Sequence, residues 1–320
     1  MSRVLVTGGS GFLGSHVTRL LVEDPSIGTV VSGDLRDSTV PGVVSERFDV
    51  TDATTLGPVL AKHRIDTVVH LAAIVNPGRD VDLEYRVDVE GTAHVLEACV
   101  SAGVRRIVVS SSGAAYGYHA DSAEWIDEHD PIRGNDVFPY SRHKRLVEEM
   151  LAQARVEHPQ LEQVIFRIGT ILGPTVRNQI TALWDAPRLL RIAGADSPFV
   201  FVWVDDVAGA MVRAAVDGPA GIYNVAGDGR LTMPEIAQRL GKRMLTLPAW
   251  ALALALRVGH ALRLTEHGPE KVIFLRYRPV LANRRLKEEF GYTPRLTSAE
   301  AFEAYLRTHP DVARNQPGSR

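Results

Sequence analysis

The fold is decided near the N-terminus, by the stretch Val4-Leu5-Val6-Thr7-Gly8-Gly9-Ser10-Gly11-Phe12-Leu13-Gly14. Its first three residues predict a short buried strand, and Gly8, Gly11 and Gly14 follow in a Gly-x-x-Gly-x-x-Gly spacing. The residues after Gly14 have a helical pattern. Glycines let the chain turn tightly and let a pyrophosphate approach the N–H groups of a helix N-terminus, where the helix dipole favours negative charge. Glycine turns are common, but this position between a strand and a helix favours dinucleotide binding over a purely structural turn.

Composition and charge narrow the class of protein. The 320 residues suffice for one large or two closely packed domains, and a net charge of −2 gives no electrostatic signature of nucleic-acid binding. The single cysteine, Cys99, excludes a disulfide framework, and the acids and histidines show no metal-ligand spacing. The chain enters a strand at once, and its most apolar stretch, 247–256, is too short to span a bilayer. We therefore expect a cytoplasmic protein without a metal site or an integral membrane segment.

An acid ends the second predicted strand, over residues 28–34. Asp34 lies 20 residues beyond Gly14 (34 − 14), the distance at which an acid commonly meets the adenosine ribose. A carboxylate there accepts hydrogen bonds from the ribose hydroxyls and repels a 2′-phosphate, which favours NAD over NADP. Arg36 leaves NADP open as the lesser alternative, because a guanidinium can pair with that phosphate.

Strand and helix patterns alternate along most of the chain. This alternation predicts an α/β fold, a Rossmann-type doubly wound parallel sheet with helices on both faces. Beyond residue 226 the pattern becomes mainly helical and is punctuated by prolines, which predicts a smaller, mainly helical C-terminal substrate-binding domain. We assign residues 1–170 to the dinucleotide-binding domain, with later contributions near 200–225. Residues 171–199 and 226–320 are assigned to the substrate-binding domain, and 314–320 are expected to form a frayed tail.

A tyrosine and a lysine share one face of the helix predicted over 140–157. Tyr140 and Lys144 are four residues apart, so their side chains point the same way. Phenols titrate near 10, but a nearby ammonium and a nicotinamide cation stabilise the phenolate, which can then take a proton from a substrate hydroxyl. A serine at the neighbouring strand end can orient the substrate oxygen. On spacing alone this pair is more often a surface pair than a catalytic site, and the spacing leaves both interpretations open.

With these features the chain resembles the extended short-chain dehydrogenase/reductase family, the NAD-dependent epimerase/dehydratase group. The motifs that carry the resemblance are Thr7-Gly-Gly-Ser-Gly-Phe-Leu-Gly14, Asp34, Asp49-Val50, His70-Leu-Ala-Ala73, Asp88-Val-Glu-Gly-Thr92, Ser110-Ser-Ser-Gly-Ala-Ala-Tyr-Gly117, Tyr140-Ser-Arg-His-Lys144, Arg167, Val204-Asp-Asp-Val-Ala208 and Phe290-Gly-Tyr-Thr-Pro294.

The resemblance implies a role for each matched residue. Tyr140 would be the catalytic base or acid, Lys144 would bind the nicotinamide ribose, and Ser112 would position the substrate oxygen. The implied cofactor contacts are Gly8, Gly11, Phe12, Leu13, Gly14, Asp34, Arg36, Asp49, Val50, Leu71, Ala72, Ala73, Tyr140, Lys144 and Ile168. Asp88 replaces the family's usual asparagine, which we interpret as a tolerated variant at a helix start. The resemblance also implies a homodimer through the helices near 85–102 and 140–157.

Departures from the family pattern narrow the expected reaction. Gly113 and Ala114 stand where sugar-nucleotide dehydratases carry an acid, and the cysteine of the epimerase/reductases is absent as well. Thr170 stands where UDP-sugar 4-epimerases have asparagine, and Trp203 where the family usually has histidine. We therefore expect an NAD-dependent oxidoreductase acting on a secondary alcohol or its ketone.

Three questions stay open at this point. One same-fold alternative is a UDP-sugar 4-epimerase with tightly bound NAD. A non-catalytic dinucleotide-sensing regulator is another, although the retained Tyr140 and Lys144 count against it. The apolar segment 249–264 suits helix packing or a subunit contact best, with a lipophilic pocket or a membrane-surface contact as alternatives.

Overall fold

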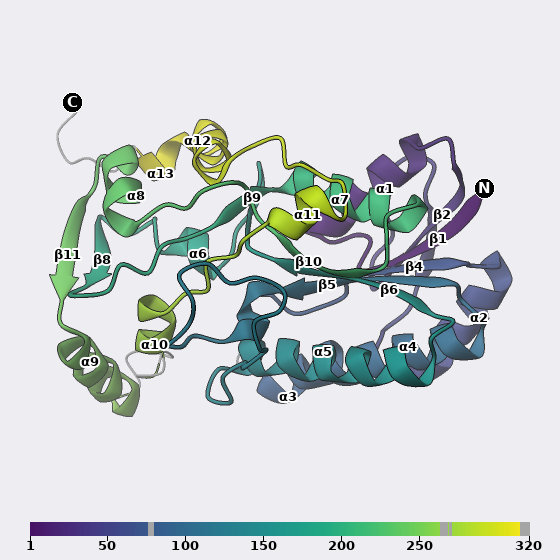
Figure 1. Cartoon of the computed structure of the whole chain (residues 1–320), viewed down its shortest axis with the longest axis horizontal. Coiled ribbons are helices and arrows are strands. Elements are labelled where there is room, and N and C mark those ends of the chain that lie inside the picture. The colour runs from purple at the N-terminus through teal and green to yellow at the C-terminus, as the bar shows by residue number, and fades with distance from the viewer. Residues whose placement is uncertain (76–79, 263–267, 269–270, 314–320) are drawn as a thin grey trace.

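The computed structural model describes residues 1–75, 80–262, 268 and 271–313 (Figure 1). The tail expected at 314–320 and the last two residues of the apolar segment 249–264 lie outside the described residues.

Seven strands form one parallel sheet in the order β10-β6-β5-β4-β1-β2-β3. The strands are β1 (Ser2–Thr7), β2 (Ile27–Asp34), β3 (Val44–Arg47), β4 (Thr67–His70), β5 (Arg106–Ser112), β6 (Glu162–Ile168) and β10 (Gly221–Val225). From β1 the chain winds outward to β3 and then returns to β4 on the other side. The order therefore reverses between β1 and β4, where open α/β sheets bind ligands beyond the carboxyl ends of their strands.

The strands are continuous apolar runs because helices cover both faces of the sheet. Val4–Val6, Val68–Val69 and Val164–Phe166 have almost no exposed surface. On one face lie α1 (Phe12–Glu23) and α7 (Val204–Val216) (Figure 1). The other face carries α2 (Ala53–His63), α4 (Gly91–Ser101) and α5 (Pro139–Glu157) (Figure 1). The predicted doubly wound Rossmann-type sheet is confirmed.

Two helix starts differ from the sequence prediction. Helix α1 begins at Phe12 rather than after Gly14, with Gly11 as its N-cap. The helix expected at 85–102 is a longer run of α3 (Val81–Tyr85), a π-helical turn η1 (Arg86–Glu90) and α4. Asp88 lies inside that π-helical turn, so its interpretation as a residue at a helix start is wrong. A π-helical turn occupies a single turn inside an otherwise α-helical run, so a general helical pattern over the segment does not distinguish it.

The remaining elements all follow β6 in the chain. They are β7 (Thr170–Leu172), α6 (Gln179–Ala182), β8 (Arg188–Ile192), β9 (Phe201–Trp203), α8 (Met233–Leu240), β11 (Arg243–Leu247), α9 (Ala249–Ala261), α10 (Lys271–Arg276), α11 (Arg284–Glu288), α12 (Ser298–Thr308) and α13 (Pro310–Ala313). Strand β7 pairs with β9, and β8 pairs with β11. The β8–β11 pair lies within the part that was predicted to be mainly helical. It was not predicted, because β11 is short and largely exposed.

The C-terminal chain also returns to the main sheet. Leu286 and Phe290 are buried in the core beside Phe166 of β6 and Val207 of α7. A separate core surrounds Trp184, with Phe199, Phe201, Phe302 and Tyr305 packed against it. The range 226–320 therefore serves both cores, and its assignment to a substrate domain remains a proposal.

Candidate active site

The glycine loop between β1 and α1 is packed too closely for side chains. Gly8 has a left-handed φ of +70°, and a Cβ at this position would lie 2.8 Å from the backbone nitrogen of Ala72. At Gly14, a Cβ would collide with the carbonyl oxygen of Gly8. Gly11 donates its N–H to the same oxygen at 3.0 Å. The loop thus exposes bare backbone at the N-terminus of α1, which suits a phosphate group.

Asp34, at the end of β2, is bound to this loop. Its carboxylate accepts the N–H of Ser10 at 3.0 Å and the N–H of Arg36 at 3.2 Å. Arg36 in turn donates from Nη2 to the carbonyl oxygen of Ser10 at 3.4 Å. The acid therefore has a fixed position beside the glycines, as a ribose-binding carboxylate requires.

A cavity of about 1080 Å³ runs along the carboxyl edge of the sheet, across the switch point between β1 and β4. Its lining includes every predicted site residue except one: Gly8, Gly11, Phe12, Leu13, Gly14, Asp34, Asp49, Val50, Leu71, Ala72, Ala73, Ser112, Tyr140, Lys144 and Ile168. The exception is Arg36, which is exposed and does not line the cavity. The residues proposed from the sequence motifs are therefore, apart from Arg36, brought together in one cavity.

The three predicted catalytic side chains face this cavity from β5 and α5. Helix α5 begins at Pro139, where the missing N–H costs nothing, and this start brings Tyr140 and Lys144 onto the cavity side. Lys144 Nζ lies 5.7 Å from the centre of the Tyr140 ring and donates to the carbonyl oxygen of Ser110 at 3.1 Å. Ser112 ends β5, and its Oγ accepts the N–H of Ala114 at 3.2 Å.

A buried ion pair joins the middle of α5 to strand β6. Arg167 of β6 donates to Glu148 of α5, with Nη2 2.7 Å from Oε2, and Ser111 binds the same carboxylate. Burial acts to lower the pKa of the Arg167 guanidinium, but the adjacent Glu148 outweighs burial and the pKa is raised. Arg167 also donates to the Tyr116 hydroxyl at 2.9 Å.

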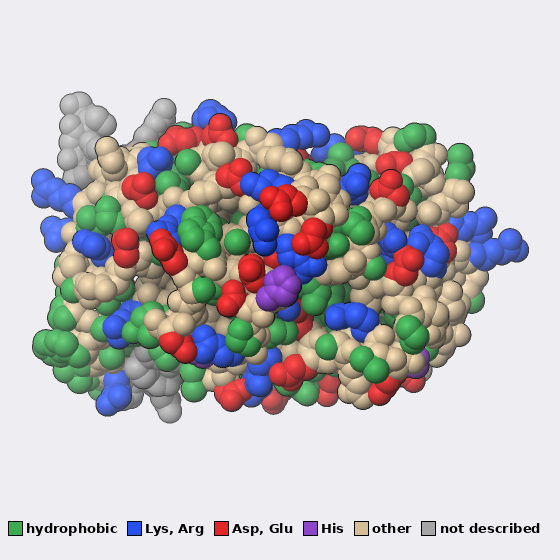
Figure 2. All heavy atoms as spheres, in the orientation of Figure 1, with side chains coloured by type: hydrophobic (Ala, Val, Ile, Leu, Met, Phe, Trp, Pro, Cys, Tyr) green, Lys and Arg blue, Asp and Glu red, His purple; other side chains and the backbone are tan. Residues whose placement is uncertain are grey.

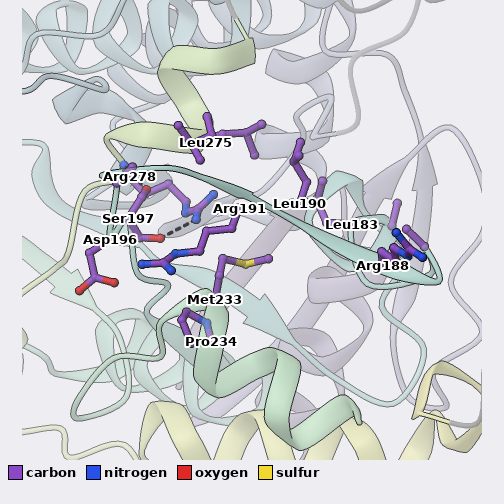
Figure 3. Close-up of a pocket in the computed structure, with 14 residues that line it drawn as sticks. Leu183, Arg188, Leu190, Arg191, Asp196, Ser197, Met233, Pro234, Leu275 and Arg278 are labelled. Carbon is purple, nitrogen blue, oxygen red and sulfur yellow. Dashed lines mark hydrogen bonds between the residues drawn. The ribbon is translucent and has the colours of Figure 1, made fainter. Parts of the chain in front are cut away.

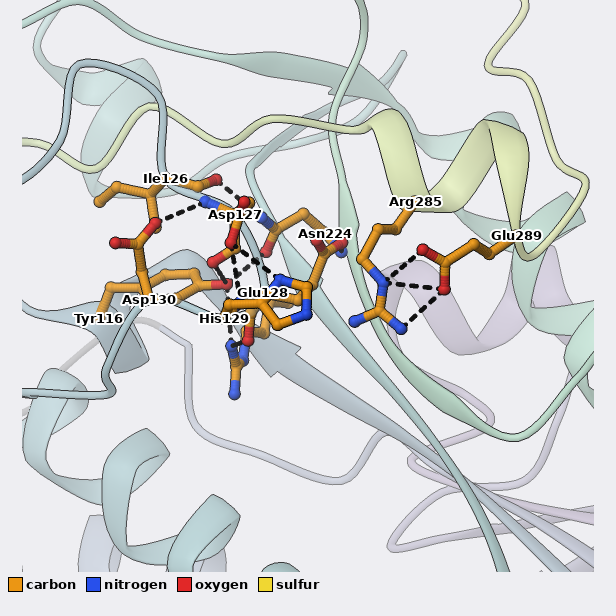
Figure 4. A network of polar contacts seen from close by, with 10 residues as sticks. Tyr116, Ile126, Asp127, Glu128, His129, Asp130, Asn224, Arg285 and Glu289 are labelled. Atoms are coloured by element: carbon orange, nitrogen blue, oxygen red, sulfur yellow. Dashed lines mark hydrogen bonds and ion pairs between the residues drawn. The ribbon is translucent and has the colours of Figure 1, made fainter.

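From Tyr116 the polar network continues to β10. The Tyr116 hydroxyl donates to Oδ1 of Asn224 at 2.8 Å, and the backbone N–H of Asn224 donates to Glu128 at 2.6 Å (Figure 4). Burial raises the pKa of the Glu128 carboxyl. Strands β5, β6 and β10 and helix α5 are thus linked by one buried network.

His70 anchors the loop that follows β4. Its ring nitrogens lie 2.7 Å from Thr7 Oγ1 and 3.0 Å from Thr92 Oγ1. Burial, followed by the charge of Lys144, lowers the pKa of His70 to about 4. Asp88 fixes the same loop by accepting the N–H of Ile74 at 2.8 Å.

The sequence analysis missed an aromatic wall next to Tyr140. The Tyr118 ring lies 5.3 Å from the rings of both Phe138 and Phe274, and the two phenylalanines stack 6.0 Å apart. All three side chains line the cavity. Phe138 immediately precedes the Pro139-Tyr140 helix start, and this adjacency was a signal available in the sequence. Phe274 lies 134 residues beyond Tyr140 (274 − 140), so only the fold brings it there.

Arg278 also lines the cavity and was not predicted. Its Nη2 donates to the carbonyl oxygen of Ser197, and its guanidinium carbon lies 3.7 Å from the centre of the Phe199 ring. Burial lowers the pKa of Arg278 to about 9, and no carboxylate pairs with it in the part of the chain that the structure describes. The same side chain reaches a smaller adjoining pocket of about 200 Å³, shared with Arg188 and Arg191 (Figure 3).

Two findings bear on other kinds of site. Among residues 1–75, 80–262, 268 and 271–313, no three His, Cys, Asp or Glu side chains are grouped so that they could hold a metal ion. None of the described helices combines the length and the apolar character needed to cross a membrane.

A glycine loop at the switch point of a parallel sheet, an acid at the end of β2 and a tyrosine–lysine helix beside them define the class: a dinucleotide-dependent enzyme of the Rossmann type. The comparison with known families narrows it further. The chain belongs to the NAD dependent epimerase/dehydratase family, whose model matches residues 4–226. The resemblance found in the sequence is thereby confirmed.

Individual proteins are similar to this chain over different shares of its length. An uncharacterized protein of Mycobacterium tuberculosis (strain ATCC 25618 / H37Rv) is 29% identical over 316 residues, covering 95% of this chain and 83% of that protein. A UDP-glucose 4-epimerase of Azospirillum brasilense is 36% identical over 182 residues, which cover 53% of this chain and 49% of that enzyme.

Solved structures agree as well. The UDP-glucose 4-epimerase of Thermus thermophilus, determined as a complex with NAD, superposes with a TM-score of 0.73 at 25% identity, covering 98% of this chain and 99% of that one. The enzyme of Thermotoga maritima, determined with UDP-glucose, has a TM-score of 0.76 at 20% identity, covering 97% and 99%; this likeness concerns the fold.

Proposed function

We propose that this protein is an NAD-dependent oxidoreductase that interconverts a secondary alcohol and its ketone. The observation that carries the proposal is the shared cavity: the glycine loop and Asp34 line one end of it, and Ser112, Tyr140 and Lys144 line its wall. A dinucleotide with its phosphates on the loop and its ribose at Asp34 would extend toward these three side chains.

The residues at the dinucleotide end fit NAD. The loop offers bare backbone where a Cβ at Gly8 or Gly14 would collide, and the Asp34 carboxylate is held in place by two N–H donors. Its charge disfavours a 2′-phosphate, so NADP is the less suitable cofactor. When bound, NAD supplies the carbon that accepts or returns a hydride.

The protein's own groups would move the proton. In the oxidising direction, Tyr140 Oη takes the proton of the substrate hydroxyl as the hydride leaves the adjacent carbon, and a carbonyl forms. Lys144 Nζ lies 5.7 Å from the centre of the Tyr140 ring, so its positive charge would favour the negative charge that develops on Tyr140 Oη during proton transfer. Ser112 donates a hydrogen bond to the substrate oxygen and keeps it within reach of Tyr140.

The aromatic wall favours a substrate with an apolar face. Phe138 and Phe274 are stacked beside Tyr140, and neither offers a hydrogen bond to a hydroxylated ring. Thr170, which lines the cavity, stands where UDP-sugar 4-epimerases carry asparagine. These features support a less polar alcohol or ketone.

Arg278 supports a second candidate, a UDP-sugar 4-epimerase that retains its NAD. A buried guanidinium without a described carboxylate partner suits an anionic group, such as the diphosphate of a sugar nucleotide. The similarity to UDP-glucose 4-epimerases of Azospirillum brasilense and Thermus thermophilus points the same way.

A substrate panel distinguishes the two candidates. The purified protein is incubated with apolar secondary alcohols or with UDP-sugars, each with NAD, with NADP or with no added cofactor, and reduced nicotinamide and sugar products are followed. Net reduction of added NAD by an apolar alcohol supports the oxidoreductase. Turnover of a UDP-sugar without added cofactor would instead establish the epimerase, and a large preference for NADP would contradict the role given to Asp34.

We further propose a homodimer through the outer faces of α4 and α5. The two helices lie side by side on one face of the sheet (Figure 1). Sedimentation equilibrium tests this proposal, and a monomer at micromolar concentration would contradict it.

A further inference from the structure

Helix α9 has an apolar stripe on its outer face, which continues to Leu262 just beyond its last residue. Trp250, Leu254, Val258 and Leu262 follow one another at every fourth position, and they are 72%, 54%, 49% and 63% exposed. Residues four apart share one side of a helix, so the four side chains form one surface. Large apolar groups exposed together in this way mark an interaction site more often than scattered single ones do.

The opposite face of α9 is part of the molecule's interior. Leu252 and Leu256 pack with Ile192 of β8 and Val272 of α10, and both leucines line the large cavity. The helix therefore separates the substrate end of the cavity from the exterior by its own thickness. Packing inside the molecule therefore explains why the inner face of α9 is apolar, but it does not explain the apolar outer face.

The charged residues of α9 and of the segment between α8 and α9 are basic. Residues 236–265 contain no Asp or Glu but five basic residues, namely Arg239, Lys242, Arg243, Arg257 and Arg263. Arg257 of α9 and Arg243 of β11 are exposed, and Arg243 is the register partner of the equally exposed Arg188 in β8. Among the described residues none of these three arginines has an ion pair. Figure 2 shows hydrophobic side chains gathered at the end of the molecule where α9 lies, with Lys and Arg side chains beside them.

We propose that this end of the molecule, the α9 face made of the four apolar residues and the three exposed arginines, docks on the surface of an anionic lipid bilayer. An amphipathic helix with tryptophan and leucine on one side and basic residues beside them inserts its apolar side at the headgroup boundary. Each nearby basic residue adds attraction to an anionic leaflet. With 13 residues, α9 is about 20 Å long and lies in the interface rather than across it.

Charge argues against a second copy of the chain as the occupant. A two-fold contact brings the same patch of both subunits together, so the unpaired arginines of one copy would face those of the other. An anionic bilayer accommodates both groups: its headgroup boundary takes up the apolar side chains, and its anionic headgroups attract the arginines.

The position of α9 links membrane docking to substrate access, an inference that rests on the proposed function. Leu252 and Leu256 line the cavity from the inner face of α9, so docking by the outer face would hold this side of the cavity against a bilayer that carries a lipid-soluble alcohol or ketone. Membrane docking itself requires no catalytic residue.

The test is co-sedimentation of the full-length protein with vesicles of phosphatidylcholine alone or with one third phosphatidylglycerol, together with the Trp250 fluorescence shift. We expect binding to the anionic vesicles, weakened at high salt, and at least about tenfold weaker binding in Val258→Glu and in Arg243→Ser/Arg257→Ser. Val44→Glu is the matched control, because Val44 is 41% exposed and lies on the far edge strand β3. Tyr140→Phe must bind as the wild type does, which separates failure of docking from failure of the proposed chemistry.

Two outcomes would overturn the proposal. One is absence of binding to every vesicle, or binding that Val258→Glu leaves intact. The other is a dimer that Val258→Glu converts to a monomer without any vesicle binding, which would make the α9 face a subunit interface.

Discussion

His143 Nδ1 lies 3.5 Å from Asp88 Oδ2, and both side chains are buried between helix α5 and the π-helical turn η1. The other oxygen of Asp88 accepts the N–H of Ile74, in the cavity-lining loop that follows β4. Asp88 thus touches both the loop and the helix that carry the proposed site.

Asp88→Ala is therefore expected to destabilise the fold by about 1–3 kcal/mol, because the part-buried N–H of Ile74 loses its acceptor. Asp88→Asn keeps an acceptor oxygen and should lose less. Urea unfolding measures both, and NAD titration should show weaker binding for Asp88→Ala. An alanine variant as stable as the wild type would contradict this role.

The Arg167–Glu148 pair should be far more sensitive to mutation than the pairs on the surface. Side-chain exposure is 3% for Arg167 and 1% for Glu148, so Glu148→Ala leaves a buried guanidinium without its partner. We expect a loss of about 3–5 kcal/mol in the free energy of unfolding. Glu288→Ala removes an exposed partner of Arg284 and serves as the control that leaves the unfolding midpoint unchanged. Equal effects of the two substitutions would contradict the assignment.

The buried His70 should make stability fall with acid. Its folded pKa of about 4 lies below the value of about 6.5 in an unfolded chain, so the unfolded state binds more protons between these values. Its contribution is complete above pH 6.5 and is lost as the pH falls toward 4, by up to about 3 kcal/mol.

Urea unfolding at pH 6.5, 5.5 and 4.5 measures this slope. His70→Gln should flatten it, whereas His129→Gln, at an exposed histidine, should not. A slope unchanged in His70→Gln would show that other groups cause it.

Asp34 should determine the choice of cofactor. Asp34→Ala removes the acceptor of the Ser10 and Arg36 N–H groups together with the charge that repels a 2′-phosphate. NAD affinity should fall by about tenfold, and the preference for NAD over NADP should shrink. Asp37→Ala, at an exposed acid paired with Arg47, is the control. Calorimetric titration with both cofactors would contradict the role of Asp34 if the two variants behaved alike.

Local patterns were sufficient to predict the sheet, and the residues they proposed for the dinucleotide, apart from Arg36, line one cavity. The apolar runs of β1, β4 and β6 are buried on both faces, and the Gly8–Gly14 loop is a contiguous motif whose geometry depends on close neighbours. Tyr140 and Lys144 are one helical turn apart, so the helix alone brings them to one side.

The substrate end was beyond such reasoning because its parts are distant in sequence. Phe274 of α10 packs with Tyr118 and Phe138, and Arg278 lines the same cavity, only because the chain folds back there. The structural role of Asp88 was also missed. This role depends on its burial beside His143 and on its hydrogen bond with the N–H of Ile74, and no local sequence pattern indicates either contact.

The most direct test of the central claim is the turnover of Tyr140→Phe on the alcohol that the substrate panel identifies, with NAD binding measured on the same sample. Tyr305→Phe, in the separate C-terminal core, controls for the loss of a phenol oxygen elsewhere. We predict that kcat falls at least about 100-fold in Tyr140→Phe while NAD binding is retained. Undiminished turnover in Tyr140→Phe would contradict catalysis by the tyrosine–lysine pair and would favour a dinucleotide-sensing protein instead.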